Sequence, residues 1–152
     1  METVRVAAFR RAVGWLMPEQ LPMAAAELLA EGQDSPARRE LAGLSGREPA
    51  AEMDGLWAGA LDGLGAERPG QEAAERWALR EVAARLHAGA LGSAREALAA
   101  VNGLDFAEGE RELTFRRVAR GCCEDCVAED GAAYDAWDAE VRAAAAALVT
   151  EG

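Results

Sequence analysis

The stretch Met53–Leu64, with the sequence MDGLWAGALDGL, carries the clearest helical pattern in the chain. Its apolar residues fall at positions i, i+3, i+4, i+7, i+8 and i+11, which places them on one face of an α-helix. They are Met53, Leu56, Trp57, Ala60, Leu61 and Leu64. This spacing predicts an amphipathic helix whose apolar face belongs to a core.

The composition extends that prediction to the whole chain. Among 152 residues there are 37 Ala and 16 Leu but no Ile, and aromatic residues make up 5%. Alanine and leucine favour close-packed helices, whereas sheets favour β-branched and aromatic residues. The length suits one ordinary domain, since two separate cores would each be small. The sequence therefore predicts an all-α fold, a single domain over residues 1–152 built as a bundle of about six to seven short helices.

The other helices are expected on both sides of Met53–Leu64. In the first of them Val6, Phe9, Val13 and Leu16 recur at helical spacing and are expected to face the core. Ser35, followed by Pro36, is the expected N-cap of a short helix. Residues 104–121 fit either a strand or a helix, and the context favours a helix. The remaining expected helices cover residues 3–17, about 18–31, 36–44, 71–91, 94–101 and 132–149.

The charge of the chain is strongly acidic. It has 27 Asp and Glu against 16 Arg and no Lys, a net charge of −11, and residues 101–152 hold 12 acids against five Arg. Such a field repels nucleic-acid phosphates and anionic lipids and attracts basic proteins. We therefore expect a basic protein partner, no nucleic acid and no membrane. Three Arg within residues 1–17 are unlike a signal peptide, which predicts a cytoplasmic protein.

The acidic residues after Gly121 are the predicted partner-binding surface. No Arg lies between Gly121 and Val141, so the repulsion among these carboxylates is expected to be uncompensated locally. Trp77, which lies off the main apolar stripe of its helix, is a second candidate for the contact. The predicted surface comprises Glu124, Asp125, Glu129, Asp130, Asp135, Asp138 and Trp77. These features indicate a non-enzymatic acidic helical protein-binding module, one instance being an immunity- or antitoxin-like inhibitor of a basic toxin.

A cysteine cluster offers the alternative function. Cys123 and Cys126 form a C-x-x-C pair, the spacing with which two thiolates grip one metal ion or form a redox pair. Cys122 and His87, which is the single histidine of the chain, complete a possible set of four zinc ligands. We expect the acids around the cluster to disfavour thiolate formation, which argues against redox chemistry. The main expectation is no cofactor, and the alternative is a metal- or thiol-dependent protein holding zinc.

Catalytic and DNA-binding patterns are weak. Two of the three serines fit helix caps, and no nucleophile is paired with a base, so no catalytic residue is predicted and an enzyme is the less favoured class. Residues 21–44 could form a helix–turn–helix with Arg38 and Arg39 on its second helix. No basic stripe supports such a recognition helix, and a structural helical hairpin is expected instead.

Residues 21–36, LPMAAAELLAEGQDSP, and residues 39–44, RELAGL, resemble a segment shared by small helical proteins of high-GC bacteria. The end of the chain, with Tyr134, an acidic stretch and Glu140–Ala143, is similar to theirs as well. The likeness covers about half of the chain and is specific in residues 21–44. The resemblance implies a shared helical fold, and it implies no activity for this chain.

Overall fold

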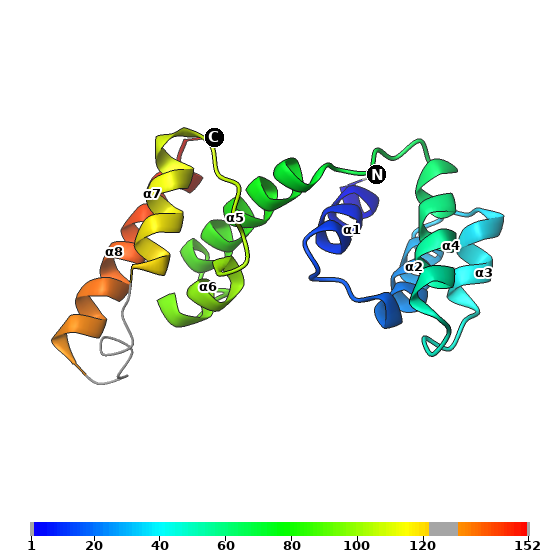
Figure 1. Ribbon diagram of the computed structural model, residues 1–152, viewed down its shortest axis with the longest axis horizontal. Helices are drawn as coiled ribbons and strands as arrows, with labels where there is room; N and C mark the ends of the chain where they lie inside the picture. The colour runs from blue at the N-terminus through cyan, green and yellow to red at the C-terminus, as the bar shows by residue number, and fades with distance from the viewer. Residues whose placement is uncertain (1, 122–130, 152) are drawn as a thin grey trace. The chain divides into compact units, whose positions relative to one another are not determined.

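The computed structural model describes residues 2–121 and 131–151, and these residues form helices with no strand among them. The all-α prediction is confirmed. The predicted six to seven helices are too few, because the described residues hold eight α-helices and one short 3-10 helix (Figure 1). These are α1 Glu2–Ala12, η1 Pro18–Gln20, α2 Leu21–Ala30, α3 Pro36–Ala42, α4 Ala50–Asp62, α5 Gln71–His87, α6 Ala94–Val101, α7 Gly109–Arg120 and α8 Ala132–Val149.

The chain divides into two compact units, Met1–Ala74 and Glu75–Gly152. The single domain over residues 1–152 stays a prediction.

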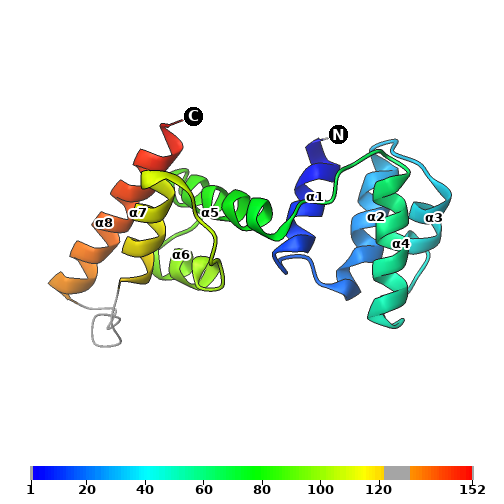
Figure 2. The same cartoon turned by 45° about the horizontal axis from the view of Figure 1, so that its top comes forward.

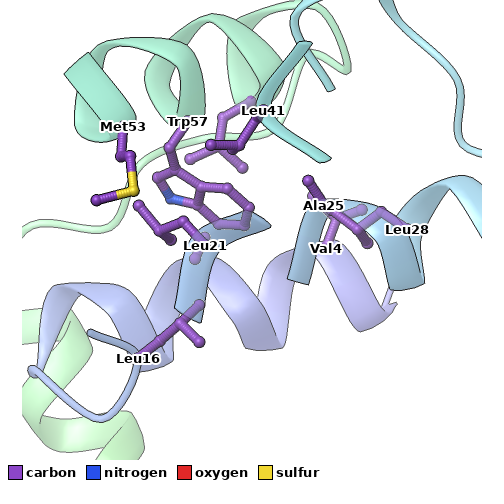
Figure 3. Close-up of a cluster of buried hydrophobic side chains, with 10 residues drawn as sticks. Val4, Leu16, Leu21, Ala25, Leu28, Leu41, Met53 and Trp57 are labelled. Atoms are coloured by element: carbon purple, nitrogen blue, oxygen red, sulfur yellow. The ribbon is translucent and has the colours of Figure 1, made fainter. Parts of the chain in front are cut away.

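The first unit is organised around the indole of Trp57. This side chain is 4% exposed and points from α4 toward Leu21 of α2 and Leu41 of α3 (Figure 3). Met53 and Leu61, on the same face of α4, are also buried. The predicted core face of Met53–Leu64 is therefore confirmed at Met53, Trp57, Ala60 and Leu61, whereas Leu56 and Leu64 are half-buried. Helices α2, α3 and α4 pack together around it.

The buried face of α1 differs from the prediction. Val4 and Ala8 are buried, whereas Val6, Phe9 and Val13 are half-buried. The helix also ends at Ala12 rather than at residue 17, because the amides of residues 15 and 16 both donate to the carbonyl oxygen of residue 10. Periodicity overlooked this face because its buried residues, Val4 and Ala8, are smaller than Phe9 and Leu16 on the expected face. Leu16, beyond the helix, is buried as expected.

The start of α3 follows the predicted cap. The Ser35 hydroxyl oxygen accepts a hydrogen bond from the backbone amide of Arg38 at 3.2 Å, with Pro36 at the first helical position. The Arg38 side chain is completely buried, and it donates to the Ser35 hydroxyl and to the Asp34 carbonyl oxygen. Burial lowers the pKa of Arg38, an effect that the charge of Asp34 partly offsets. A buried Arg38 does not offer its guanidinium to DNA.

The second unit contains the segment whose pattern was ambiguous. Residues 109–120 form the helix α7, as the context favoured, and Phe115 and Ala119 are buried whereas Leu113 is 44% exposed. α7 and α8 pack side by side and both contact α6 (Figures 1 and 2). They run antiparallel, since Arg111 donates to the carbonyl oxygen of Ala147.

The predicted end of one helix in this unit needs correction. α5 ends at His87 rather than at residue 91, because the amides of residues 90 and 91 both donate to the carbonyl oxygen of Arg85. Ala90, which lies beyond the end of the helix, is exposed. On α8 the side chains of Trp137, Val141 and Leu148 are buried.

Candidate functional site

Most of the residues predicted for partner or metal binding lie in residues 122–130, outside the described part of the chain. Their predicted roles stay predictions. They are Cys122, Cys123, Glu124, Asp125, Cys126, Glu129 and Asp130.

The two remaining acids of the predicted surface, Asp135 and Asp138, have different surroundings on α8. Asp135 is exposed. One carboxylate oxygen of Asp138 accepts a hydrogen bond from the backbone amide of Ala94 at 2.8 Å, and the other accepts from Arg142 Nε at 2.7 Å. Arg142 also donates to the Gly92 carbonyl oxygen. The expectation of uncompensated repulsion is therefore wrong for Asp138, because an Arg one helical turn later neutralises it.

The environment of Asp138 favours its ionised form. Burial raises the pKa of this carboxyl, but the hydrogen bonds from Arg142 and from the Ala94 amide outweigh burial, so the pKa is lowered. Because the Ala94 amide is the first of α6, Asp138 satisfies a donor that the helix itself leaves unpaired.

Replacing Asp138 with alanine is expected to lower the free energy of unfolding by about 1–2 kcal/mol, since a helix-capping acceptor and an ion pair are lost together. The matched change Asp135→Ala on the same helix is expected to stay within about 0.5 kcal/mol. Urea unfolding followed by circular dichroism measures both. Equal effects of the two substitutions would show that the contacts of Asp138 contribute nothing specific.

The other described candidates, Trp77 and His87, both lie on α5. Trp77 is half-buried, and His87 is the exposed last residue of the helix. Within residues 2–121 and 131–151, no three His, Cys, Asp or Glu side chains lie together in a group that could hold a metal ion. The predicted zinc set depends on the three cysteines outside those ranges.

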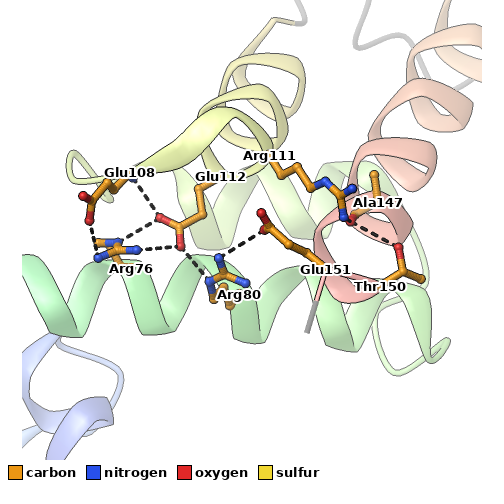
Figure 4. A network of polar contacts seen from close by, with 8 residues as sticks. All are labelled: Arg76, Arg80, Glu108, Arg111, Glu112, Ala147, Thr150 and Glu151. Atoms are coloured by element: carbon orange, nitrogen blue, oxygen red, sulfur yellow. Dashed lines mark hydrogen bonds and ion pairs between the residues drawn. The ribbon is translucent and has the colours of Figure 1, made fainter.

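A buried carboxylate that sequence reasoning missed lies on α7. The side chain of Glu112 is buried, and it accepts hydrogen bonds from Arg76 Nε at 3.0 Å and from Arg80 Nε at 2.6 Å (Figure 4). The backbone amide of Glu108 donates to it as well, at 2.8 Å. Glu108 also pairs with Arg76, and Glu151 pairs with Arg80, so the network joins α5, the start of α7 and the end of the described chain.

The network keeps Glu112 ionised. Burial raises the pKa of this carboxyl, but the hydrogen bonds from Arg76, from the Glu108 amide and from Arg80 together lower it below the usual glutamate value. A general acid at neutral pH requires a raised pKa instead. The contacts occupy both carboxylate oxygens, and we assign Glu112 a structural role.

The surface with binding geometry lies in the first unit, between α1 and the segment η1–α2. It is a groove of about 390 Å³ whose floor is apolar and whose edge is polar. Leu16 and Leu28, both buried, form the floor together with Val6 and Ala24. The side chain of Met23 stands at the edge and is 67% exposed, the highest value among the large hydrophobic residues of the described chain.

We name this surface, with Glu19, Met23 and Glu27 at its edge, the α1–α2 groove. Glu19, Met23, Glu27 and Glu31 follow one another at four-residue intervals, so they share one side of η1–α2. All four are exposed, and within the described chain none of the three glutamates forms an ion pair. Arg10 is the cation on the opposite side of the groove.

The position of Glu19 depends on one glycine. Gly46, in the connection between α3 and α4, adopts a φ of +87°, and a Cβ there would lie 2.8 Å from the carbonyl oxygen of Glu19. Such a distance is shorter than any real contact of that kind, and the positive φ disfavours a side chain as well. Glycine at position 46 therefore lets the connection pack directly on η1. The four-residue spacing along residues 19–31 was visible in the sequence, but its pairing with α1 was not.

Comparison of the chain with protein-family models, with curated proteins and with solved structures gave no match. In the described part of the chain, each helix is too short or too polar to cross a membrane.

Proposed function

We propose that the protein is a non-enzymatic acidic binding module for a basic protein partner, an immunity- or antitoxin-like inhibitor of a basic toxin being one instance. The observation that carries the proposal is the α1–α2 groove, which combines an apolar floor, an exposed methionine and unpaired carboxylates. Interfaces of this kind bind an amphipathic segment by burying its apolar side chains and by pairing charges around them.

The distribution of the arginines supports the same proposal. Many described arginines are committed to their own unit: Arg11 pairs with Asp54, and Arg120 donates to the carbonyl oxygens of Val101, Asn102 and Leu104. Cations used in this way do not compensate Glu19, Glu27 or Glu31. The excess negative charge, −11 for the chain, therefore includes exposed carboxylates at the α1–α2 groove. These carboxylates attract a basic partner toward the groove.

A partner segment that fits the groove has defined chemistry. Its apolar side chains would contact Met23 and the floor at Val6 and Ala24, and its Lys or Arg side chains would pair with Glu19 and Glu27. The acids of residues 124–138 outside the groove, with Trp77, stay a predicted second contact for such a partner. The interaction requires no catalytic group.

A double variant, Glu19→Gln with Glu27→Gln, tests the groove against simple net charge. The probe is a fluorescent amphipathic helical peptide of Leu and Arg. Each lost ion pair contributes about 0.2–1 kcal/mol, so we expect the peptide to bind about threefold to tenfold more weakly, with a smaller salt dependence. The matched control, Glu40→Gln with Glu52→Gln, removes the same charge from exposed positions outside the groove and is expected to change binding less than about twofold.

The apolar part of the groove is tested by Met23→Ser in the same titration, because loss of an exposed apolar anchor weakens binding without removing charge. If both double variants weaken binding equally and Met23→Ser has no effect, peptide binding depends only on the net charge of the protein. The proposal that the α1–α2 groove is the binding site is then wrong.

The alternative function, a metal- or thiol-dependent protein, rests on Cys122, Cys123 and Cys126 with the exposed His87. Native mass spectrometry separates the two proposals. One zinc ion per chain, lost in a variant carrying Cys123→Ser and Cys126→Ser, would favour the alternative, since a structural zinc site needs these thiolates.

A further inference from the structure

A second cavity of the first unit has a charge opposite to that of the groove. It is a cleft of about 530 Å³ between α1 and residues 65–73, the segment that joins α4 to the first turn of α5. Phe9, Ala66, Pro69 and Ala73 provide apolar walls. Two cations, Arg5 and Arg68, line it together with one acid, Glu67. A cleft lined by two cations stands out in a chain whose acids exceed its arginines by eleven.

Arg5 is held over an aromatic ring rather than by a carboxylate. Its guanidinium carbon lies 5.3 Å from the centroid of the Phe9 ring, one helical turn along α1. Among the described residues it forms no ion pair. A guanidinium stacked on a ring keeps the N–H groups at its edge, and these match the oxygens of a carboxylate or phosphate.

Arg68 is attached weakly to its own unit. Its Nη2 lies 3.6 Å from a carboxylate oxygen of Asp62, and both side chains are well exposed, at 59% and 66%. Pairs of this kind contribute little to stability, so the guanidinium can exchange Asp62 for another anion.

The segment that carries Arg68 is fixed at its beginning. Gly65 follows α4 with a φ of +62°, a conformation that favours glycine, and the amide of Ala66 donates to the carbonyl oxygen of Leu61 at 3.0 Å. This closure anchors the segment to the end of α4, whose Leu61 side chain is in the core.

We infer that this cleft binds a small molecule in which a planar apolar body carries an anionic group, a carboxylate or a phosphate. The body contacts Phe9 and Pro69, and the anion pairs with Arg5 and Arg68. The volume lies in the range of about 300–1,000 Å³ that small-molecule sites occupy. Glu67 disfavours a second anionic group on the same ligand, so a single anionic group is expected. This site is independent of the α1–α2 groove.

The test is an NMR titration of the ¹⁵N-labelled full chain with phenyl phosphate and with benzoate, which distinguish the two anions. We expect saturable shifts in the backbone amides of residues 66–73, with a dissociation constant below about 10 mM for at least one probe. Benzyl alcohol supplies the body alone and inorganic phosphate the anion alone, and both are expected to bind more weakly.

Arg5→Gln and Arg68→Gln are each expected to weaken the better probe about fivefold to tenfold, the effect of losing one charged hydrogen-bond donor at an open site. Arg47→Gln, an exposed position of the same unit outside the cleft, is the control with the same charge change. Absence of saturable shifts with both probes, or an equal effect of Arg47→Gln, would overturn the inference. Binding of inorganic phosphate as tightly as phenyl phosphate would overturn the part of the inference that assigns Phe9 and Pro69 to an apolar body.

Discussion

A Trp57→Ala variant is expected to lose about 3–5 kcal/mol of unfolding free energy, the cost of emptying a well-packed aromatic site. The indole is 4% exposed and lies where α2, α3 and α4 meet, against Leu21 and Leu41 (Figure 3). Those two side chains are fixed on separate helices, so they cannot easily close the cavity. The loss includes the burial of the ring and the contacts of its neighbours.

Urea unfolding followed by circular dichroism measures this loss, and hydrogen exchange of the amides in α2–α4 localises it. Met23→Ala, a substitution of an exposed apolar residue in the same unit, is the control and is expected to stay within about 0.5 kcal/mol. A cost below about 1 kcal/mol for Trp57→Ala would mean that α4 does not carry the core.

Replacing Glu112 with glutamine is expected to cost about 2–3 kcal/mol, because a neutral amide cannot accept charged hydrogen bonds from both Arg76 and Arg80. The larger cost of breaking a fully buried pair, about 3–5 kcal/mol, is not expected, since both arginines are partly exposed and regain water. Glu110→Gln, at an exposed position two residues earlier in α7, is the control.

The same network makes stability depend on pH. The pKa of Glu112 is lower in the folded chain than in the unfolded one, so the unfolded chain takes up the proton first as pH falls. The contribution of Glu112 is complete above the ordinary glutamate pKa of about 4.3 and is lost as pH falls through the lower folded value. The stability difference between wild type and Glu112→Gln should therefore shrink in acid. A constant difference would contradict an ionised Glu112.

The two substitutions together test the prediction of a single domain. Trp57 belongs to residues 1–74 and Glu112 to residues 75–152. If the chain unfolds as one domain, both variants shift one common transition. Hydrogen exchange that shows each variant loosening its own unit would replace the single domain with two.

Sequence reasoning succeeded where the apolar residues were large and the local signals agreed. The face of α4 and the cap at Ser35 follow from spacing and from local hydrogen-bond chemistry, which one segment contains by itself. It failed where burial depends on a distant partner. Glu112 is buried, although its type predicts exposure, because it pairs with arginines 32 and 36 positions away. Arg38 is a separate case: its partners, Ser35 and Asp34, are local, yet its complete burial was not predicted.

The candidate sites also divide into those that one segment reveals and those that depend on contacts between segments. An acid-rich segment such as residues 124–140 is conspicuous in a sequence, whereas the α1–α2 groove needs two helices to meet. The sequence predicts that Phe9 faces the core of the protein. In the structure Val4 and Ala8 of α1 are buried instead, and the Phe9 ring lines a cleft with Arg5 and Arg68. Single-sequence periodicity cannot decide between two faces when one of them is built from alanine.

The hydrogen bonds from α8 to the start of α6 have a consequence for folding on the ribosome. The core residues of the first unit extend from Val4 to Leu61, so the last of them is synthesised before any residue of α6. The amide of Ala94 and the carbonyl of Gly92, in contrast, are bound by side chains 44 and 50 positions further along. A nascent chain grows from its N-terminus, and its early segments fold first. The core of the first unit can thus form before Asp138 and Arg142 leave the exit tunnel. Until they do, the Ala94 amide and the Gly92 carbonyl lack the side chains that bind them in the folded chain.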